Sequence, residues 1–239
     1  MRGIAMNEKT PNTQAQNPSF FSILRAELLC HIPYGILSVA ASLFVTSLIL
    51  FWTPVTPTFS KDASTLFHTL HFIHILFASS SVVLAFRKYS QSLFAALALG
   101  IIVPAIFCTL SDVFLPYWGG QLFGLNVTLH LCFKHHLSSI LPFLFAGMIN
   151  GLLLSHKKNC DDLMSQAMVS HFSHSFISAL ASILYLISHG LASLKHDMGI
   201  IFIVLLVSVI IPCIVSDVIV PALCARAFTT KACEHDCSH

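Results

Sequence analysis

Apolar residues in this chain gather into six long runs that are separated by short polar segments. About 20 consecutive apolar residues are needed for a helix to cross the hydrocarbon core of a bilayer, and each run reaches roughly that length. The pattern predicts an all-α integral membrane protein with about six transmembrane helices. The predicted spans lie near residues 30–52, 63–85, 91–115, 135–155, 166–190 and 198–225.

One connecting stretch, residues 116–134, is too apolar for an ordinary loop. It is expected either to extend the fourth helix or to lie at the membrane interface. Tyr117 and Trp118 favour the interface, because amphipathic aromatic rings concentrate at the level of the lipid headgroups.

Composition supports the membrane assignment. Of the 239 residues, 56% are hydrophobic and only 9% are charged, whereas about a quarter of a soluble domain is charged. Most of the surface therefore faces lipid, and the bilayer is an expected partner. The net charge of +2 comes from basic residues scattered singly or in pairs. This scatter lacks the basic stripe of a nucleic-acid-binding surface, so no nucleic acid is expected.

The distribution of Lys and Arg predicts the orientation. Nine of them fall in segments on the same side as the N-terminus, and three (Lys61, Lys134 and Lys195) fall on the other side. Cytoplasmic loops of membrane proteins carry the excess of basic residues. Both termini are therefore expected in the cytoplasm, with the protein in the cell (inner) membrane.

An internal repeat is visible in the third and sixth predicted spans. The sequence CTLSDVFLP at 108–116 recurs as CIVSDVIVP at 213–221, with five identical positions. HFIH at 71–74 likewise recurs as HFSH at 171–174, and His31 has a weaker counterpart in His136. The matches occur in the same order along the chain, which favours duplication of a three-helix unit.

The repeat defines the expected domain organisation. Residues 29–119 form the first three-helix repeat and residues 129–228 the second, flanked by a cytoplasmic segment (1–28) and a Cys/His-rich tail (229–239). Because three is odd, the second repeat enters the membrane from the opposite side. Inverted-topology repeats are frequent in secondary transporters, and a symmetric scaffold without a transport role is the alternative.

The repeated residues predict metal binding. Ionisable groups inside a bilayer are costly unless they are paired or liganded, and Asp112 and Asp217 are repeat mates inside predicted spans. Histidines three apart on a helix project from one face, as in both HxxH segments. Imidazole and carboxylate ligands suit zinc, iron or manganese. Two candidate sites follow: an outer one of His71, His74, Asp112 and His136, and an inner one of His171, His174, Asp217 and His31.

Less specific explanations apply to other polar residues of the spans. An isolated intramembrane histidine is usually hydrogen-bonded to a neighbouring helix. That is the expectation for His68, His130, His156, His189 and His196. Cys108 and Cys213 are expected to be buried thiols that act as small hydrophobes, with a role as soft metal ligands as the alternative.

These patterns favour a divalent metal ion transporter over two other functions. One is a membrane electron carrier with two b-type haems held by histidines of facing helices. The other is a membrane-embedded hydrolase in which the metal activates water. The sequence contains no Gly-rich nucleotide-binding loop, HExxH motif or nucleophile elbow. These motifs indicate nucleotide-binding proteins, zinc proteases and α/β-hydrolases.

Overall fold

The computed structural model describes residues 20–53, 56–125, 127–130, 133–156, 160–191 and 194–226. Within these residues the chain is helical apart from short turns, and no strand is present. The helices of the first half are α1 (Phe20–Trp52), α2 (Pro57–Tyr89), α3 (Leu93–Thr109), the π-helical turn η1 (Leu110–Phe114) and α4 (Leu115–Leu122). Those of the second half are α5 (Phe133–Ser155), α6 (Cys160–Ser188), α7 (Leu194–Leu205), η2 (Leu206–Ile210), α8 (Ile211–Ile214), η3 (Val215–Ile219) and α9 (Val220–Arg226).

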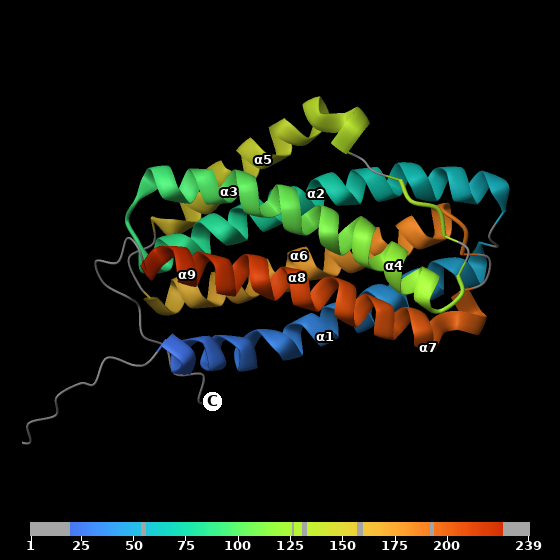
Figure 1. Ribbon diagram of the computed structural model, residues 1–239, viewed down its shortest axis with the longest axis horizontal. Coiled ribbons are helices and arrows are strands. Elements are labelled where there is room, and N and C mark those ends of the chain that lie inside the picture. The colour runs from blue at the N-terminus through green and yellow to red at the C-terminus, as the bar shows by residue number, and fades with distance from the viewer. Residues whose placement is uncertain are drawn as a thin grey trace, which may run out of the picture.

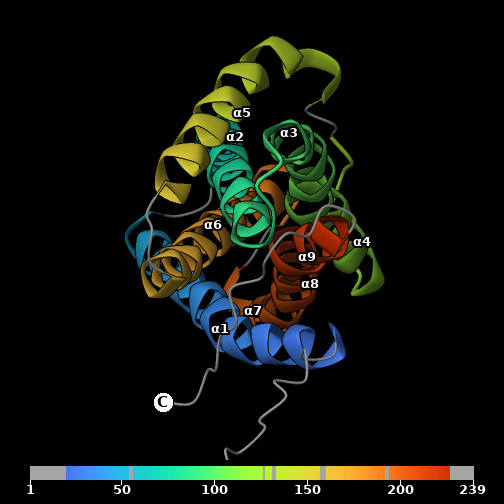
Figure 2. The ribbon, with the colours of Figure 1, turned by 90° about the vertical axis from the view of Figure 1, so that its left-hand side faces the viewer.

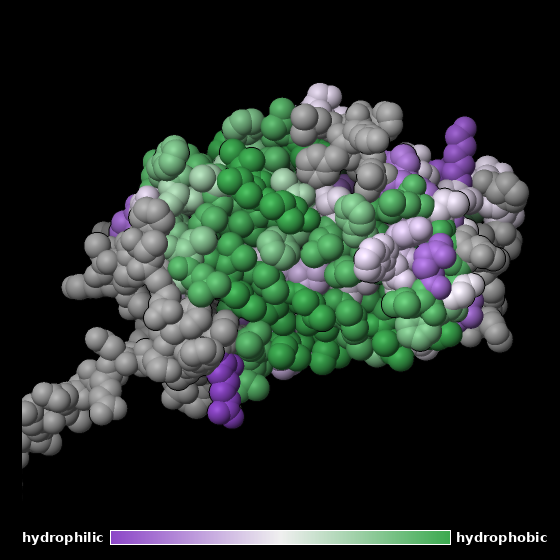
Figure 3. Space-filling model, viewed as in Figure 1, coloured by the Kyte–Doolittle hydropathy of each residue, from purple (hydrophilic) through white to green (hydrophobic). Residues whose placement is uncertain are grey.

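Six of the helical segments are long and apolar enough to cross a membrane, as the hydropathy pattern predicts. They are Leu28–Trp52, Thr58–Tyr89, Leu93–Leu122, Ser138–Ser155, Met168–Ser188 and Asp197–Ala225. Figure 3 shows a broad band of hydrophobic residues over the middle of one face, with hydrophilic residues nearer its two ends. The prediction of a helical chain with six segments able to span a membrane is confirmed.

The assignment of residues 116–134 needs a correction. Residues 116–122 neither extend the fourth helix nor leave the bundle, because α4 continues the third span without a break as far as Leu122. The turn after it places Gly124 at φ 76°, a conformation that residues with a side chain rarely adopt. The chain then returns to begin α5 at Phe133.

Two antiparallel helices, α2 and α6, lie next to each other inside the bundle (Figures 1 and 2). The helices α1, α3, α5 and α9 pack around this pair. We name the two ends of the bundle by the residues found there. The basic end holds Arg87 and Lys88 at the last turn of α2, and the loop end holds residues 123–125, 127–130 and 189–191.

Local sequence signals fix the start and the end of α2. Thr56 caps the helix, because its hydroxyl accepts a hydrogen bond from Phe59 N, and Pro57 occupies the first helical position, which needs no amide donor. At the other end Ser90 adopts an extended conformation. The helix is consequently longer at both ends than the hydropathy run of 63–85, and His71 and His74 lie close to its middle.

Small residues allow α5 to approach α2 closely. A Cβ atom added to Gly147 would lie 2.3 Å from Leu76 O, and one added to Gly151 would lie 2.7 Å from Ser80 O. The two glycines are four residues apart, the spacing that lets membrane helices bring their backbones together. This contact packs α5 on the side of α2 opposite to the polar residues described next.

Candidate metal centre

The first polar group lies between α2 and the π-helical turn η1. His71 and His74 are three residues apart, so both rings project from one face of α2. Their Nδ1 atoms each donate a hydrogen bond of 2.8 Å to the same oxygen, Asp112 Oδ2. All three side chains are fully or almost fully buried. We call these residues the Asp112 group.

Two serines complete the coordination of the Asp112 carboxylate. Ser111 Oγ and Ser178 Oγ lie 2.8 and 2.6 Å from Asp112 Oδ1, and both hydroxyls donate to it. Ser178 comes from α6, so this carboxylate connects α2, η1 and α6. A buried carboxylate is tolerated when its lone pairs are satisfied in this way.

The second polar group repeats this arrangement on α6 and η3. His171 Nδ1 donates a 3.0 Å hydrogen bond to Asp217 Oδ2, and His174 Nδ1 lies 3.2 Å from the same oxygen. Ser216 Oγ donates to Asp217 Oδ1 at 2.9 Å. We call His171, His174 and Asp217 the Asp217 group; its side chains are also buried.

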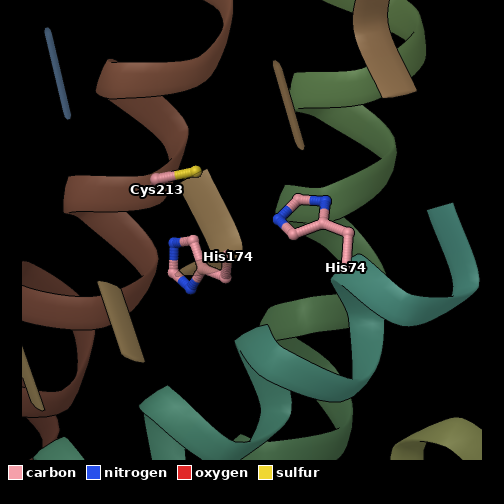
Figure 4. A group of neighbouring side chains, drawn as sticks. All are labelled: His74, His174 and Cys213. Atoms are coloured by element: carbon pink, nitrogen blue, oxygen red, sulfur yellow. The ribbon is translucent and has the colours of Figure 1, made fainter. Parts of the chain in front are cut away.

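The two groups adjoin each other in the middle of the bundle. The rings of His74 and His174 have centroids 5.5 Å apart, and Cys213 of α8 lies beside them. Figure 4 shows the two imidazoles on either side of a small space toward which the Cys213 sulfur points. One atom of each of these three side chains lies within 4.8 Å of the others, a compact group that could hold a metal ion.

The two groups lie closer together than the outer and inner sites expected from the sequence. His74 and His174 adjoin, with ring centroids 5.5 Å apart. Each HxxH pair lies near the middle of its helix, within Pro57–Tyr89 for α2 and Cys160–Ser188 for α6.

Of the two histidines expected from the opposite repeat, the structure describes one side chain. The His31 ring lies 4.8 Å from the His171 ring, measured between centroids, so His31 adjoins the Asp217 group as expected. His136 lies in the first turn of α5, but its side chain is outside the described residues. The Cys/His-rich tail, residues 229–239, is outside them too.

The hydrogen bonds fix which ring nitrogens can bind a cation. A carboxylate only accepts, so the Nδ1 atoms of His71, His74 and His171 carry the protons. In these three rings the basic lone pair is then on Nε2. His174 Nδ1 makes no such hydrogen bond. Among the described residues, Nε2 of His71, His171 and His174 has no hydrogen-bond partner, while His74 Nε2 lies 3.8 Å from Cys108 Sγ.

Buried ring nitrogens without a partner are costly, at about 1–3 kcal/mol each. Three of them in one small region suit a ligand that accepts their lone pairs, and metal-bound histidines typically donate the other N–H to a carboxylate. Asp112 and Asp217 orient their histidines through these contacts. Both also belong to groups of side chains that could hold a metal ion, so direct ligation by the aspartates stays a prediction.

Sequence reasoning missed Ser178 as part of the site. The signal was present, because His171, His174, Ser178 and Ser182 are spaced by three or four residues and share one face of α6. Ser182 Oγ donates to Ser111 O at 3.1 Å, which ties the same face to η1. A serine in a membrane helix commonly bonds its own backbone, so the spacing alone does not separate the two roles.

Comparisons with protein-family models, with curated protein sequences and with solved structures found no match to this chain. The function is therefore inferred from the geometry of the buried residues.

Proposed function

We propose that this protein binds a divalent first-row transition metal ion in the middle of the membrane and moves it across the bilayer. The supporting observation is the meeting of His74, His174 and Cys213 between the Asp112 and Asp217 groups. Imidazole and thiolate together favour ions such as zinc or iron(II) over calcium or magnesium, which prefer oxygen ligands.

The arrangement suits transfer of an ion better than permanent storage. Three groups of side chains that could hold a metal ion overlap. The central group of His74, His174 and Cys213 shares His74 with the Asp112 group and His174 with the Asp217 group. An ion leaving one group already contacts a ligand of the next. Movement through a membrane protein requires several such sites, none of which binds too tightly to release the ion.

A route from the Asp217 group toward the basic end supports the same function. A small pocket there is lined by His31, Asp217, Lys88 and Tyr89, together with Ser81, Ala85 and Val218. The pocket links the Asp217 group to the end of α2, where the half-buried Arg87 lies. We place this end in the cytoplasm, because basic residues concentrate on the inner side of a membrane.

The architecture that we propose is a pair of three-helix repeats with opposite orientation, residues 29–119 and 129–228. Matched local contacts support it. Ser111 Oγ bonds Cys108 O and Asp112 Oδ1, and Ser216 Oγ bonds Cys213 O and Asp217 Oδ1 in the same pattern. The π-helical turns η1 and η3 also begin 105 residues apart, at Leu110 and Val215. Inverted repeats typically meet at the transport site.

The two other functions fit the geometry less well. A b-type haem needs two histidines on opposite sides of a planar macrocycle, whereas the rings of His171 and His174 are 5.2 Å apart and those of His74 and His174 are 5.5 Å apart. A hydrolase needs space for a substrate beside the metal. The pocket at the basic end is small and reaches only the Asp217 group.

The direct test is metal binding and uptake by the purified protein. Elemental analysis should find a transition metal bound, and proteoliposomes containing the protein should accumulate Zn²⁺, Fe²⁺ or Mn²⁺ detected by a trapped indicator. His74→Ala should abolish uptake, whereas His156→Ala should leave it unchanged, because His156 is exposed and its ring bonds Leu152 O of the adjoining α5. An unaltered uptake rate in His74→Ala, or a Soret band in the purified protein, would refute the proposal.

A further inference from the structure

Three histidines that the central site does not use gather at the loop end of the bundle. His68 lies on α2, one turn before His71, while His130 and His189 lie on the connecting segments after α4 and α6. The His68 and His130 rings have centroids 5.5 Å apart, and the His130 and His189 rings 5.4 Å apart. All three side chains are half-buried, although His68 Nε2 is itself enclosed.

Hydrogen bonds hold the segment that carries His130 against α6. The Tyr185 hydroxyl donates to Thr128 O and accepts from His130 N, both at 3.1 Å. Thr128 N donates to His189 O at 2.9 Å. Tyr185 is fully buried and its ring stacks on His189 at 4.4 Å. The position of His130 beside His189 is therefore fixed by the fold.

The backbone selects the tautomer of two of these rings. His68 Nδ1 lies 2.7 Å from Ser64 O, and His189 Nδ1 lies 2.9 Å from Tyr185 O. A carbonyl oxygen only accepts, so Nδ1 carries the proton in both rings and Nε2 carries the basic lone pair. An Nδ1–H bonded to a backbone carbonyl is a usual arrangement for a histidine that binds metal through Nε2.

The spacing of the rings matches a shared ion. With Zn–N distances of about 2.0–2.1 Å, two imidazoles on one tetrahedral ion have ring centroids roughly 5 Å apart. The groups of side chains whose ligand atoms already converge in the described residues lie in the centre of the bundle and do not include these three histidines. The His68, His130 and His189 rings must therefore turn about their side-chain bonds to close on an ion.

We infer that His68, His130 and His189 form a second, shallower binding site for a divalent transition metal ion. The site lies where an ion would arrive from the side opposite to the basic end. Phe67 contacts His68, His71 and His189, so one aromatic ring separates the shallow site from the Asp112 group. Metal binding at this shallow site does not depend on the proposed transport function. Its role in supplying ions to the central site does rest on that function.

The test measures ion stoichiometry and uptake in the same preparations of full-length protein. Titration with Co²⁺, whose visible absorption reports its ligands, should show two classes of site in the wild type. His130→Ala and His189→Ala should each remove the weaker class and leave the tighter class unchanged. Retention of the tighter class also shows that the variants are folded. His156→Ala should retain both classes.

The two proposals fail in different ways. In proteoliposomes, His130→Ala should raise the ion concentration for half-maximal uptake by about tenfold without lowering the maximal rate. A weak class that persists in both variants would overturn the shallow site, whatever the protein does in uptake. Wild-type protein that shows both classes but no uptake would refute transport and leave the shallow site standing as a metal site.

Discussion

The Asp112 and Asp217 groups contain the same arrangement of two histidines and one aspartate, but they differ in burial and in the number of hydrogen bonds to the carboxylate. Asp112 is fully buried and accepts from two histidines and two serines. Asp217 is 5% exposed, its histidines lie at 3.0 and 3.2 Å, and one serine, Ser216, donates to it. The pocket at the basic end reaches Asp217 alone of the two aspartates.

This difference gives the groups separate roles in the proposed mechanism. A fully satisfied, buried carboxylate holds its histidines in fixed positions, because every change of its partners leaves a polar atom unpaired. A carboxylate with fewer partners beside a pocket exchanges them at lower cost. In this structure the Asp112 group is therefore fully enclosed, whereas a pocket connects the Asp217 group to the basic end.

The largest effect is expected where the groups join. Exchanging both His74 and His174 for alanine removes the two rings that the overlapping sets of ligands share, so central metal binding should be lost. Elemental analysis of the purified variant measures this directly. The double variant His71→Ala/His171→Ala keeps the central pair with Cys213 and should retain a reduced stoichiometry. Equal losses in the two double variants would show that the groups do not act through a common centre.

The next largest effect should separate the two aspartates. Asp112→Asn places an amide donor among four hydrogen-bond donors and should lower the free energy of unfolding by about 3 kcal/mol. Asp217→Asn should cost about half as much, because fewer donors surround that carboxylate and the pocket admits water. Thermal unfolding in detergent ranks the variants, with the exposed Asp62→Asn as the control. A larger loss in Asp217→Asn would reverse the comparison.

A change of metal preference is expected from the central thiol. Cys213→Ser replaces a soft ligand by a hard one and should weaken binding of Zn²⁺ or Cd²⁺ at least roughly tenfold, with a smaller effect on Mn²⁺. Competition titrations measure the ratio. Cys224→Ser is the matched control, because Cys224 is a free, half-buried cysteine outside the groups of potential ligands. The same ratio in both variants would remove Cys213 from the site.

The smallest effect should come from one hydroxyl. Ser178→Ala removes the donor 2.6 Å from Asp112 Oδ1 and should cost about 1 kcal/mol of stability and roughly tenfold in metal affinity. Ser173→Ala on the same helix is the control, since Ser173 Oγ bonds only Val169 O of its own helix. If both variants bind metal like the wild type, the Asp112 group does not depend on its enclosure by α6.

Much of the fold was accessible from hydropathy, because a bilayer imposes a nearly fixed length on every span. The continuation of the third span through α4 was not. Its sequence, LPYWGGQL, has a proline at the second position and contains two glycines, residues that ordinarily end a helix. Here Gly119 allows close packing, since an added Cβ would lie 2.6 Å from a Val204 methyl group. Tertiary packing thus overrides local propensity.

The candidate site was predictable in its residues but not in its shape. Repetition of the HxxH and CxxSD motifs identified the histidines and aspartates, because ionisable residues in lipid need partners. It could not show that the two groups meet, since that depends on where α2 and α6 cross. Nor could it identify the loop-end histidines, because His130 reaches His68 only through the hydrogen bonds that Tyr185 makes to the connecting segment.

The π-helical turns also determine where this chain can change in length. Leu115 N bonds Leu110 O, and Val220 N bonds Val215 O, so each turn accommodates one residue more than an α-helix would. Deleting a residue elsewhere in these spans would rotate the rest of the helix by about 100°. A deletion inside 110–114 or 215–219 would instead restore a regular helix and displace only the aspartate. A homologue with a one-residue gap there would keep the bundle and lose the site.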